Sequence, residues 1–301
     1  MTTVNHDAIV TDDHRRAGIY RGEFFLYSPN RESLALVEFA REMIREAFGG
    51  RDPETAQFDI PVEAFAALLA ELKPRFIHHP ESKRLIRELL LALGCDSAET
   101  YFDVPRLRTS TSDDYLTTGI AYAFHPHRDT WYSAPFSQIN WWLPVYPITS
   151  DNAMAFHPNY WQRSVLNSSE RYDYAEWNRT SRKDAAKHIG TDTREQPKPL
   201  EPLALQPDLR LLPPPGGTIL FSAAQLHSSV PNTSGRTRFS IDFRTVHLQD
   251  VRSLSGAANV DSRCTGSTMG DYLRCDDYAR LPQEAMAPYD GGPPQPVVAG
   301  L

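Results

Sequence analysis

The stretch GGTILFSAAQLHSSVPNTSGRTRFSIDFRTVHL, residues 216–248, decides the fold class. It reads as a Gly-Gly turn, a short strand at 218–222, a histidine, a polar turn and a second strand. Other short segments share its β-branched and aromatic character, at 101–111, 114–124, 136–148 and 152–158. Several short strands without helices between them predict an antiparallel sandwich or barrel.

The N-terminal part has a different pattern. Residues 31–93 place apolar side chains near a period of 3.6, which predicts helices. The pattern ends at Gly94, a residue suited to the position after a helix. We therefore expect a β-rich α+β fold, with N-terminal helices that buttress a sheet.

These patterns predict one domain over residues 1–301. Its expected parts are a mainly helical N-terminal part at 1–99, a strand core at 100–157 and 213–248, a lid-like insertion at 158–212, and a C-terminal extension at 249–301. The insertion is expected to be a lid because long irregular segments in compact domains are usually functional or solvated.

Composition excludes several classes of protein. The chain has 301 residues, with 31 Lys and Arg against 38 Asp and Glu. Such an acidic chain is a poor nucleic-acid binder. No apolar run is long enough to span a bilayer, and no apolar segment near the start resembles a secretory signal. Three cysteines without a CxxC pair are typical of a reduced protein, so we expect a cytoplasmic location.

A candidate metal site begins with FHPHRDTWY, residues 124–132. His127 and Asp129 are two residues apart, so on an extended segment both side chains point the same way. His227 lies about a hundred residues later, after the strand at 218–222. Two histidines and a carboxylate are the ligand set of a facial triad, which holds Fe(II) and leaves open positions.

A basic residue and a hydroxyl follow His227 at a short distance. Arg238 and Ser240 share one face of the predicted last strand, and a guanidinium fork plus a hydroxyl suits the far carboxylate of a small dicarboxylate. Arg236 competes with Arg238 for this role, and the sequence does not decide whether Thr237 or Arg238 faces inward. The face that Arg238 shares with Ser240 favours Arg238.

Residues close to the metal pair are candidates for lining a pocket. Trp131 and Tyr132 follow Asp129 closely, and the amides of Gln138 and Asn140 alternate onto one face of the next strand. Together with Arg128, these side chains make a polar and aromatic mixture. They predict a small polar or amphiphilic metabolite as the substrate, with Asn140 a candidate for contacting a cofactor.

These motifs resemble the Fe(II)/2-oxoglutarate-dependent dioxygenases, and most of all their phytanoyl-CoA dioxygenase-like branch. Three stretches carry the resemblance: the His127-x-Asp129 segment, WWLPVYPITSDNAMAFHPNYW at 141–161, and GGTILFSAAQLHSSVPNTSGRTRFS at 216–240. The second is similar to the family pattern W-x-L-x-x-x-T, E/D-N-G and I-P-G-S-H. The third is similar to G-D-x-x-x-F, H, N-x-S and R. Departures occur in turns, such as Ala153 where the family usually has glycine.

The resemblance implies a double-stranded β-helix, a cupin-like jelly roll. It implies that His127, Asp129 and His227 hold Fe(II), and that Arg238 and Ser240 bind 2-oxoglutarate. The enzyme would use O2 to oxidise, most simply to hydroxylate, a natural-product intermediate of secondary metabolism, while 2-oxoglutarate becomes succinate. Halogenating members have Gly or Ala in place of the acid, so Asp129 indicates oxygenation.

Two other functions fit parts of the pattern. The same three ligands can hold Zn in a hydrolase, although Arg238 and Ser240 would then have no role. A non-catalytic jelly-roll binding protein is the second alternative, although it would not need all three ligands. The sequence leaves open the identity of the substrate, the regiochemistry, the choice among hydroxylation, desaturation and cyclisation, and the oligomeric state.

Overall fold

The computed structural model describes residues 2–180, 185 and 187–296. Parts of the predicted insertion (181–184 and 186) and the end of the predicted C-terminal extension (297–301) lie outside the described residues. The described chain is a sheet-rich α+β structure, as the sequence predicts.

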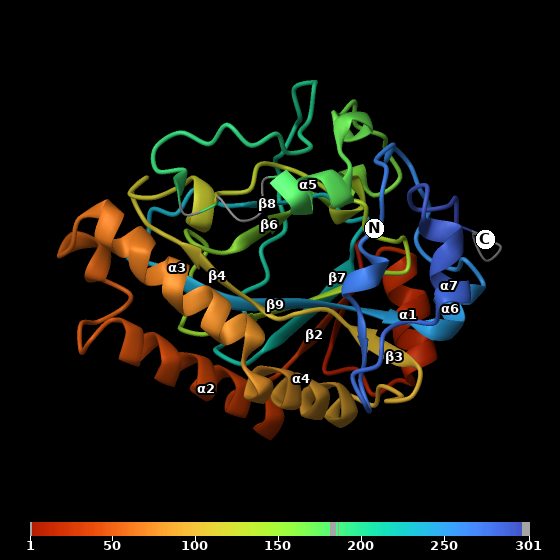
Figure 1. Ribbon diagram of the computed structural model, residues 1–301, viewed down its shortest axis with the longest axis horizontal. Helices are drawn as coiled ribbons and strands as arrows, with labels where there is room; N and C mark the ends of the chain where they lie inside the picture. Colours follow the sequence, from red (N-terminus) through yellow and green to blue (C-terminus); the bar gives the residue numbers. More distant parts are fainter. Residues whose placement is uncertain (1, 181–184, 186, 297–301) are drawn as a thin grey trace.

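A large sheet of eight strands forms the centre of the molecule (Figure 1). Its order is β1-β2-β7-β5-β9-β3-β10, with β4 also paired to β9. Neighbours are antiparallel except β1 and β2, which run parallel. The strands are β1 (Val4–His6), β2 (Phe24–Tyr27), β3 (Thr100–Phe102), β4 (Arg106–Ser110), β5 (Ile139–Pro144), β7 (Thr218–Ser222), β9 (Arg238–His247) and β10 (Leu273–Arg274).

A second, two-stranded sheet lies on the side of the large sheet away from the long helices (Figure 1). It pairs β6 (Met154–Phe156) with β8 (His227–Ser229) in antiparallel register, so that Phe156 is opposite His227. Four of the expected strand regions therefore contain strands, and His227 itself begins one.

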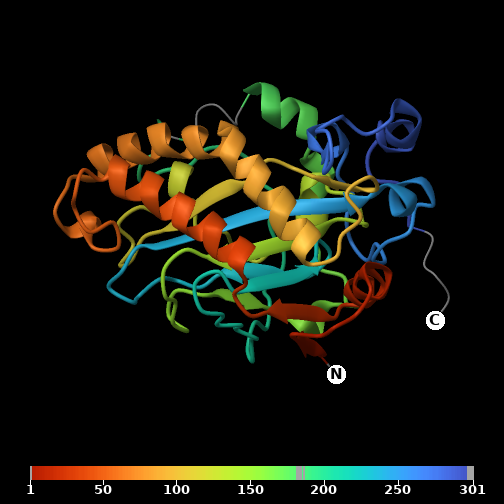
Figure 2. The same ribbon diagram turned by 90° about the horizontal axis from the view of Figure 1, so that it is seen from below.

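Helices cover the other face of the large sheet (Figure 2). They are α2 (Arg31–Ala47), α3 (Val62–His78) and α4 (Pro80–Ala92), which confirms the helical prediction for 31–93 apart from the connection between the first two. The side chain of Asn30 caps α2 by accepting from the backbone of Ser33. Gly94 follows α4 with a φ of +77°, where a side chain would be strained.

Strand β9 shows how the sequence builds two different faces. Phe239, Ile241 and Phe243 belong to the main core together with buried residues of the helices. Burying each such side chain contributes about 1.5–3 kcal/mol. The alternate residues Arg238 and Asp242 point to the opposite face, where they line a cavity. The alternation thus separates the apolar core from a polar interior.

One expectation about the strands is wrong. Residues 114–124 form no strand, because Asp113, Asp114 and Gly119 have φ values of +56°, +55° and +59°, which interrupt an extended backbone. The segment contains only a 3-10 turn at Gly119–Ala121. In addition, the N-terminal part contributes β1 and β2 to the edge of the large sheet, which the helical pattern does not reveal.

The remaining elements are short. The insertion contributes α5 (Tyr174–Thr180), and the C-terminal extension contributes α6 (Leu248–Arg252) and α7 (Gln283–Met286), while α1 (Asp12–Tyr20) lies near the N-terminus. Further 3-10 turns occur at Ala56–Phe58, Asp129–Tyr132, Pro158–Tyr160, Ser169–Arg171, Met269–Asp271 and Ala287–Tyr289. Among the described residues, none of the helices has the length and apolar character to cross a membrane.

Candidate metal centre

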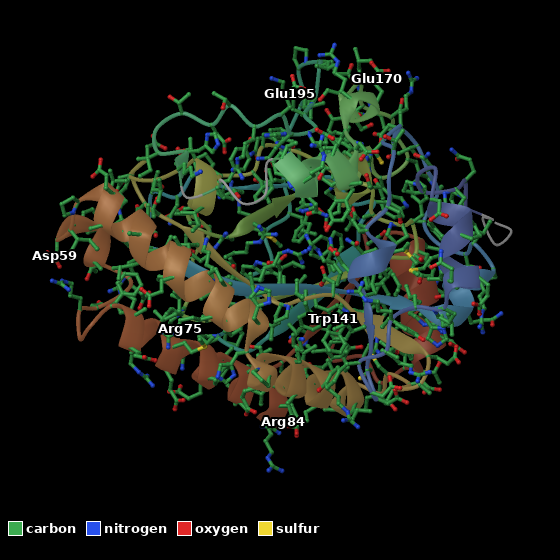
Figure 3. The ribbon with its side chains drawn as sticks, in the orientation of Figure 1. Asp59, Arg75, Arg84, Trp141, Glu170 and Glu195 are labelled. Atoms are coloured by element: carbon green, nitrogen blue, oxygen red, sulfur yellow. The ribbon has the colours of Figure 1, made fainter. Side chains whose placement is uncertain are left out.

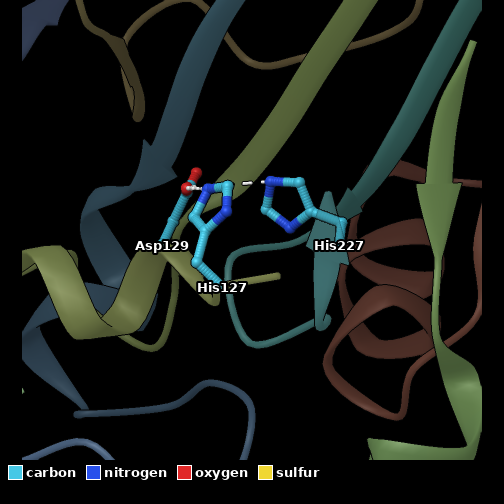
Figure 4. Close-up of side chains that lie close together, drawn as sticks. All are labelled: His127, Asp129 and His227. Atoms are coloured by element: carbon cyan, nitrogen blue, oxygen red, sulfur yellow. Dashed lines mark ion pairs between the residues drawn. The ribbon is translucent and has the colours of Figure 1, made fainter. Parts of the chain in front are cut away.

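The structure brings His127, Asp129 and His227 together (Figure 4). One potential ligand atom from each residue lies within 4.8 Å of the others. The two histidines are direct partners in an isolated β-bridge, with reciprocal backbone hydrogen bonds of 2.9 Å. Asp129 begins the 3-10 turn that follows His127. Backbone pairing therefore fixes two of the three side chains next to each other.

Hydrogen bonds to backbone carbonyls fix the tautomer of both rings. His127 Nδ1 lies 2.8 Å from the carbonyl oxygen of His125, and His227 Nδ1 lies 2.9 Å from that of Gln225. A carbonyl can only accept, so each Nδ1 carries the proton and each Nε2 keeps its lone pair. These Nε2 atoms lie 3.5 and 3.9 Å from Asp129 Oδ1. Lone pairs and a carboxylate thus converge on one point.

The pKa values of Asp129 and His227 favour the forms that bind a cation. Burial alone would raise the pKa of Asp129, but the electrostatic influence of the neighbouring His127 and His227 rings lowers it to about 2. Burial, followed by the charge of His127, lowers the pKa of His227 to about 4. At neutral pH the site therefore offers an anionic carboxylate and a neutral imidazole. This donor set fits a divalent transition-metal ion.

A chain of amides and a phenol holds Asp129 in place. Gln138 Nε2 donates to Asn140 Oδ1 at 2.8 Å and to Asp129 Oδ2 at 3.3 Å, and its Oε1 accepts from the Tyr272 hydroxyl at 2.7 Å. The contact with Tyr272 orients the amide, so that its nitrogen faces the carboxylate. The sequence singles out Gln138 and Asn140 but gives no signal for Tyr272, which lies in the C-terminal extension.

Replacing Gln138 with leucine is expected to weaken binding of Fe(II) by about 10- to 100-fold, the usual cost of losing a partner that orients a metal ligand. Anaerobic calorimetry of Fe(II) binding measures the effect. The exposed Gln249 gives a matched control, and Gln249→Leu should bind Fe(II) like the wild type. Equal affinities for the two variants would show that Gln138 does not support the metal centre.

Arg238 and Ser240 lie on the cavity side of β9. Arg238 Nη1 donates to the carbonyl of Asn152 at 2.7 Å, and its guanidinium carbon lies 5.6 Å from the ring centroid of Trp142. Burial lowers the pKa of Arg238 to about 10, which leaves it charged at neutral pH. Arg238 Nε and Ser240 Oγ are buried and have no hydrogen-bond partner among the described residues. Arg238 lines the cavity, and Ser240 lies on the same face of β9 without itself lining it. Two unpaired donors on one face of a strand fit an incoming carboxylate.

Arg236 lies in a different environment. Its side chain is 56% exposed and forms an ion pair of 3.5 Å with Glu54. Because Arg236 is at the surface and Arg238 is buried beside the cavity, the structure favours Arg238 for an internal role.

A cavity of about 390 Å³ lies between the two sheets and reaches the triad. Tyr132, Gln138 and Asn140 line it, as does Arg238. The insertion and the C-terminal extension close other parts of its wall, through Tyr172, Tyr174, Trp177, Arg194, Gln196, Thr268, Asp271 and Tyr272. The cavity therefore combines a candidate metal centre with an aromatic and charged wall.

Two residues expected to contact a substrate do not line this cavity. Arg128 is completely buried and pairs with Asp261 at 3.0 Å, and Trp131 Nε1 donates to the same carboxylate at 2.7 Å. Arg128 also donates to the backbone carbonyls of Ala224, Tyr160 and Arg163. The expectation for this pair is therefore corrected, because both side chains point away from the cavity and stabilise the surrounding loops.

Several residues that line the cavity are not predicted from the sequence. Lys73 comes from α3, and Arg108 and Asp242 come from the neighbouring strands β4 and β9. The alternation of β4 places Arg106 and Arg108 on the same face, which is a signal that the sequence offers. Lys73 gives no such signal, because it lies on a helix whose packing cannot be read locally.

Comparison with solved structures finds non-haem enzymes, which is the class that the sequence resembles. ThoJ, a non-haem monooxygenase in its apo form, is 13% identical with a TM-score of 0.44, over 90% of this chain and 92% of that chain. SnoK, an α-ketoglutarate-dependent carbocyclase from nogalamycin biosynthesis, is 14% identical with a TM-score of 0.43, over 95% and 96%. EvdO2 from Micromonospora carbonacea var. aurantiaca, complexed with 2-oxoglutarate, is 15% identical with a TM-score of 0.42, over 80% and 93%.

At these identities and TM-scores, the likeness carries no argument about the function of this chain. No protein-family model and no curated protein matches it. The function is therefore argued from the geometry of the metal centre and the cavity.

Proposed function

We propose that this protein is a non-haem Fe(II)/2-oxoglutarate-dependent oxygenase with a double-stranded β-helix core. The observation that carries the proposal is the convergence of two Nε2 lone pairs and one carboxylate beside a buried, unpaired Arg238–Ser240 donor pair. A metal centre alone would also suit a Zn hydrolase. The donor pair on the adjoining strand favours a dicarboxylate co-substrate, because nothing else among the described residues satisfies these two donors.

Each residue has a defined part in this proposal. His127, Asp129 and His227 would hold Fe(II), while Arg238 and Ser240 would bind the far carboxylate of 2-oxoglutarate. Asn140, which lies opposite Arg244 and accepts from Gln138, would contact the co-substrate closer to Asp129. The bound iron and 2-oxoglutarate would supply an oxidant made from O2, with release of succinate and CO2. Tyr132, whose ring meets the His127 ring edge-on at 5.4 Å, would limit the space available to a substrate.

The insertion at 158–212 would act as a wall or lid over the reacting centre. Tyr172 and Trp177 contact each other at 5.9 Å between ring centroids, and Tyr172 also meets Tyr132 at 5.3 Å. These aromatic contacts would exclude water from the centre while the oxidant is present. The proposed substrate is a small polar or amphiphilic metabolite, such as a natural-product intermediate, which would be hydroxylated.

The test is to add Fe(II) and then 2-oxoglutarate to the apo-protein without oxygen, and to look for the weak visible charge-transfer band of the chelate. The band should appear with the wild type and be lost in His227→Ala, which removes a ligand. A folded protein that binds iron without giving the band would overturn the 2-oxoglutarate assignment and favour hydrolysis. Retention of the band in His227→Ala would overturn the ligand assignment.

Arg238→Gln is expected to weaken 2-oxoglutarate binding by about 10- to 100-fold, because a charge-assisted hydrogen bond is worth about 1.5–3 kcal/mol. Titration of the visible band with 2-oxoglutarate measures the change. Arg236→Gln removes an exposed guanidinium two residues away and should leave the titration unchanged. If Arg236→Gln has the larger effect, the carboxylate binds elsewhere.

A further inference from the structure

The cavity contains a lysine whose ammonium group lacks a carboxylate partner. Lys73 extends from α3, which runs along β4 (Figure 1), and its ammonium donates to the carbonyl oxygen of Ile120. Of the carboxylates in the described chain, none lies within ion-pair distance of this nitrogen. Burial, together with the charge of Arg108, lowers the pKa of Lys73 to about 7. A buried ammonium without a counterion is costly.

Arg108, on strand β4 beside α3, has hydrogen-bond partners in the described chain for only some of its guanidinium nitrogens. Its Nε and Nη2 donate to the two oxygens of Asp242 at 2.8 and 3.3 Å. Within the described residues, its Nη1 has no acceptor, and the side chain is one-third exposed toward the cavity. A second guanidinium also lies close to Asp242, because Arg244 Nη2 is 3.9 Å from Asp242 Oδ2. Asp242 is therefore engaged by Arg108 and approached by Arg244, and it forms no ion pair with Lys73.

The charges in this part of the cavity do not balance. Lys73, Arg108 and Arg238 all line it, and Asp242 acts electrostatically on both Lys73 and Arg238. Under the proposed function, the 2-oxoglutarate carboxylate would neutralise Arg238. Lys73 and Arg108 would then still face the single carboxylate of Asp242, so this end of the cavity carries excess positive charge when Lys73 is protonated. Such a site favours an anion.

The aromatic ring of Phe124 contacts both Arg108 and His127, a residue of the candidate metal centre. The guanidinium carbon of Arg108 lies 5.3 Å from the ring centroid of Phe124, and that ring lies 5.1 Å from the ring of His127. About one ring therefore separates the Arg108 guanidinium from a candidate metal ligand. Tyr122 and Trp177 add aromatic surface to the same cavity. A molecule that extends from Lys73 to the triad would place an apolar body against these rings.

We propose that Lys73 and Arg108 form a subsite for a carboxylate of the substrate, whose apolar or aromatic body extends toward His127. This inference rests on the proposed function and deepens it, because it identifies the substrate class as an organic monocarboxylate. The carboxylate accepts from the Lys73 ammonium and from Arg108 Nη1. Its body, about one ring in length, brings a carbon atom to the metal centre.

The test compares phenylacetate with its neutral isostere phenylacetamide. Both are titrated by calorimetry into the protein loaded with Fe(II) and 2-oxoglutarate without oxygen. Phenylacetate should bind at least about tenfold more tightly than the amide, since it alone gains charge-assisted hydrogen bonds. This preference should disappear in Lys73→Met and in Arg108→Gln, and should persist in Lys73→Arg, which keeps the charge.

Arg84→Gln serves as the control, because Arg84 lies on the outer surface of α4 and points into solvent (Figure 3). It should retain the full preference for phenylacetate. Equal binding of acid and amide by the wild type, no binding of phenylacetate, or an unchanged preference in Lys73→Met would each overturn the subsite.

The proposed function can fail separately from the subsite. Arg238→Gln should weaken the binding of 2-oxoglutarate but keep the preference for phenylacetate over phenylacetamide. Lys73→Met should keep the affinity for 2-oxoglutarate but lose that preference. A wild type that prefers phenylacetate but shows no chelate band would support the anion subsite and overturn the oxygenase proposal. A chelate band without that preference would overturn the subsite alone.

Discussion

Asp129→Ala is expected to lower the affinity for Fe(II) by more than about 100-fold, which exceeds the usual cost of losing a partner of a ligand. The substitution removes the only anionic ligand and leaves two neutral imidazoles, which hold a divalent ion weakly. Anaerobic calorimetry gives the affinity, and succinate release in the presence of 2-oxoglutarate should fall to background.

Asp59→Asn is a matched control for this substitution, because Asp59 lies on the outer surface far from the triad (Figure 3). It should bind Fe(II) like the wild type. Circular dichroism should show that the Asp129→Ala protein is folded, since the carboxylate contributes no backbone contacts to the β-bridge of the histidines. Wild-type affinity in a folded Asp129→Ala protein would contradict the metal assignment.

Asp261→Ala is expected to destabilise the fold by about 3–5 kcal/mol, the usual cost of breaking a buried ion pair from one side. Asp261 accepts from Arg128 Nε at 3.0 Å, from Trp131 Nε1 at 2.7 Å and from the backbone of Val165 at 3.1 Å. Its removal leaves the completely buried Arg128 without a counterion. Urea unfolding followed by fluorescence measures the loss in the free energy of unfolding.

The exposed ion pair of Arg252 and Glu284 provides the comparison. Glu284→Ala should cost no more than about 1 kcal/mol, because exposed pairs are screened by solvent. The loss in the free energy of unfolding for Asp261→Asn should lie between those for Asp261→Ala and Glu284→Ala. The asparagine keeps a hydrogen-bond acceptor but loses the charge. A loss below 1 kcal/mol for Asp261→Ala would show that solvent reaches Arg128 and that the pair is not structurally important.

The sequence predicts the elements whose patterns are local. The stretch at 216–248 contains β7 and β9, and the alternation of β9 correctly separates core residues such as Phe239 from cavity residues such as Arg238. Strand β2 escapes prediction because its four residues, FFLY, lack polar alternation and lie between two helices. The strand predicted at 114–124 is absent because positive φ values interrupt the extended backbone. The positive φ values of Asp113 and Asp114 leave no trace in the hydrophobic periodicity of the sequence.

The candidate site, like the fold, could be predicted only where its residues lie close together in the sequence or within a recognisable local pattern. His127 and Asp129 could be paired from their spacing, and the strand-and-turn pattern around His227 identified it as the third candidate. The function of Arg128 could not be inferred, because its partner Asp261 lies 133 residues away in the C-terminal extension. Lys73 was missed for a similar reason: its position in the cavity depends on how α3 packs beside β4. Spacing identifies ligands on one segment, whereas burial and counterions depend on the tertiary fold.

The order of strands has a consequence for how the chain reaches its folded state. The sheet begins at one edge with β1 and ends at the other with β10, and its central strand β5 pairs Trp141 with Leu220 on one side and with Phe243 on the other. During synthesis, the apolar strand INWWLP must wait for both partners, which emerge many residues later. Contacts so distant in sequence close slowly, and exposed apolar strands associate with other chains meanwhile. We therefore expect newly made chains to be most prone to association before β9 has emerged and paired.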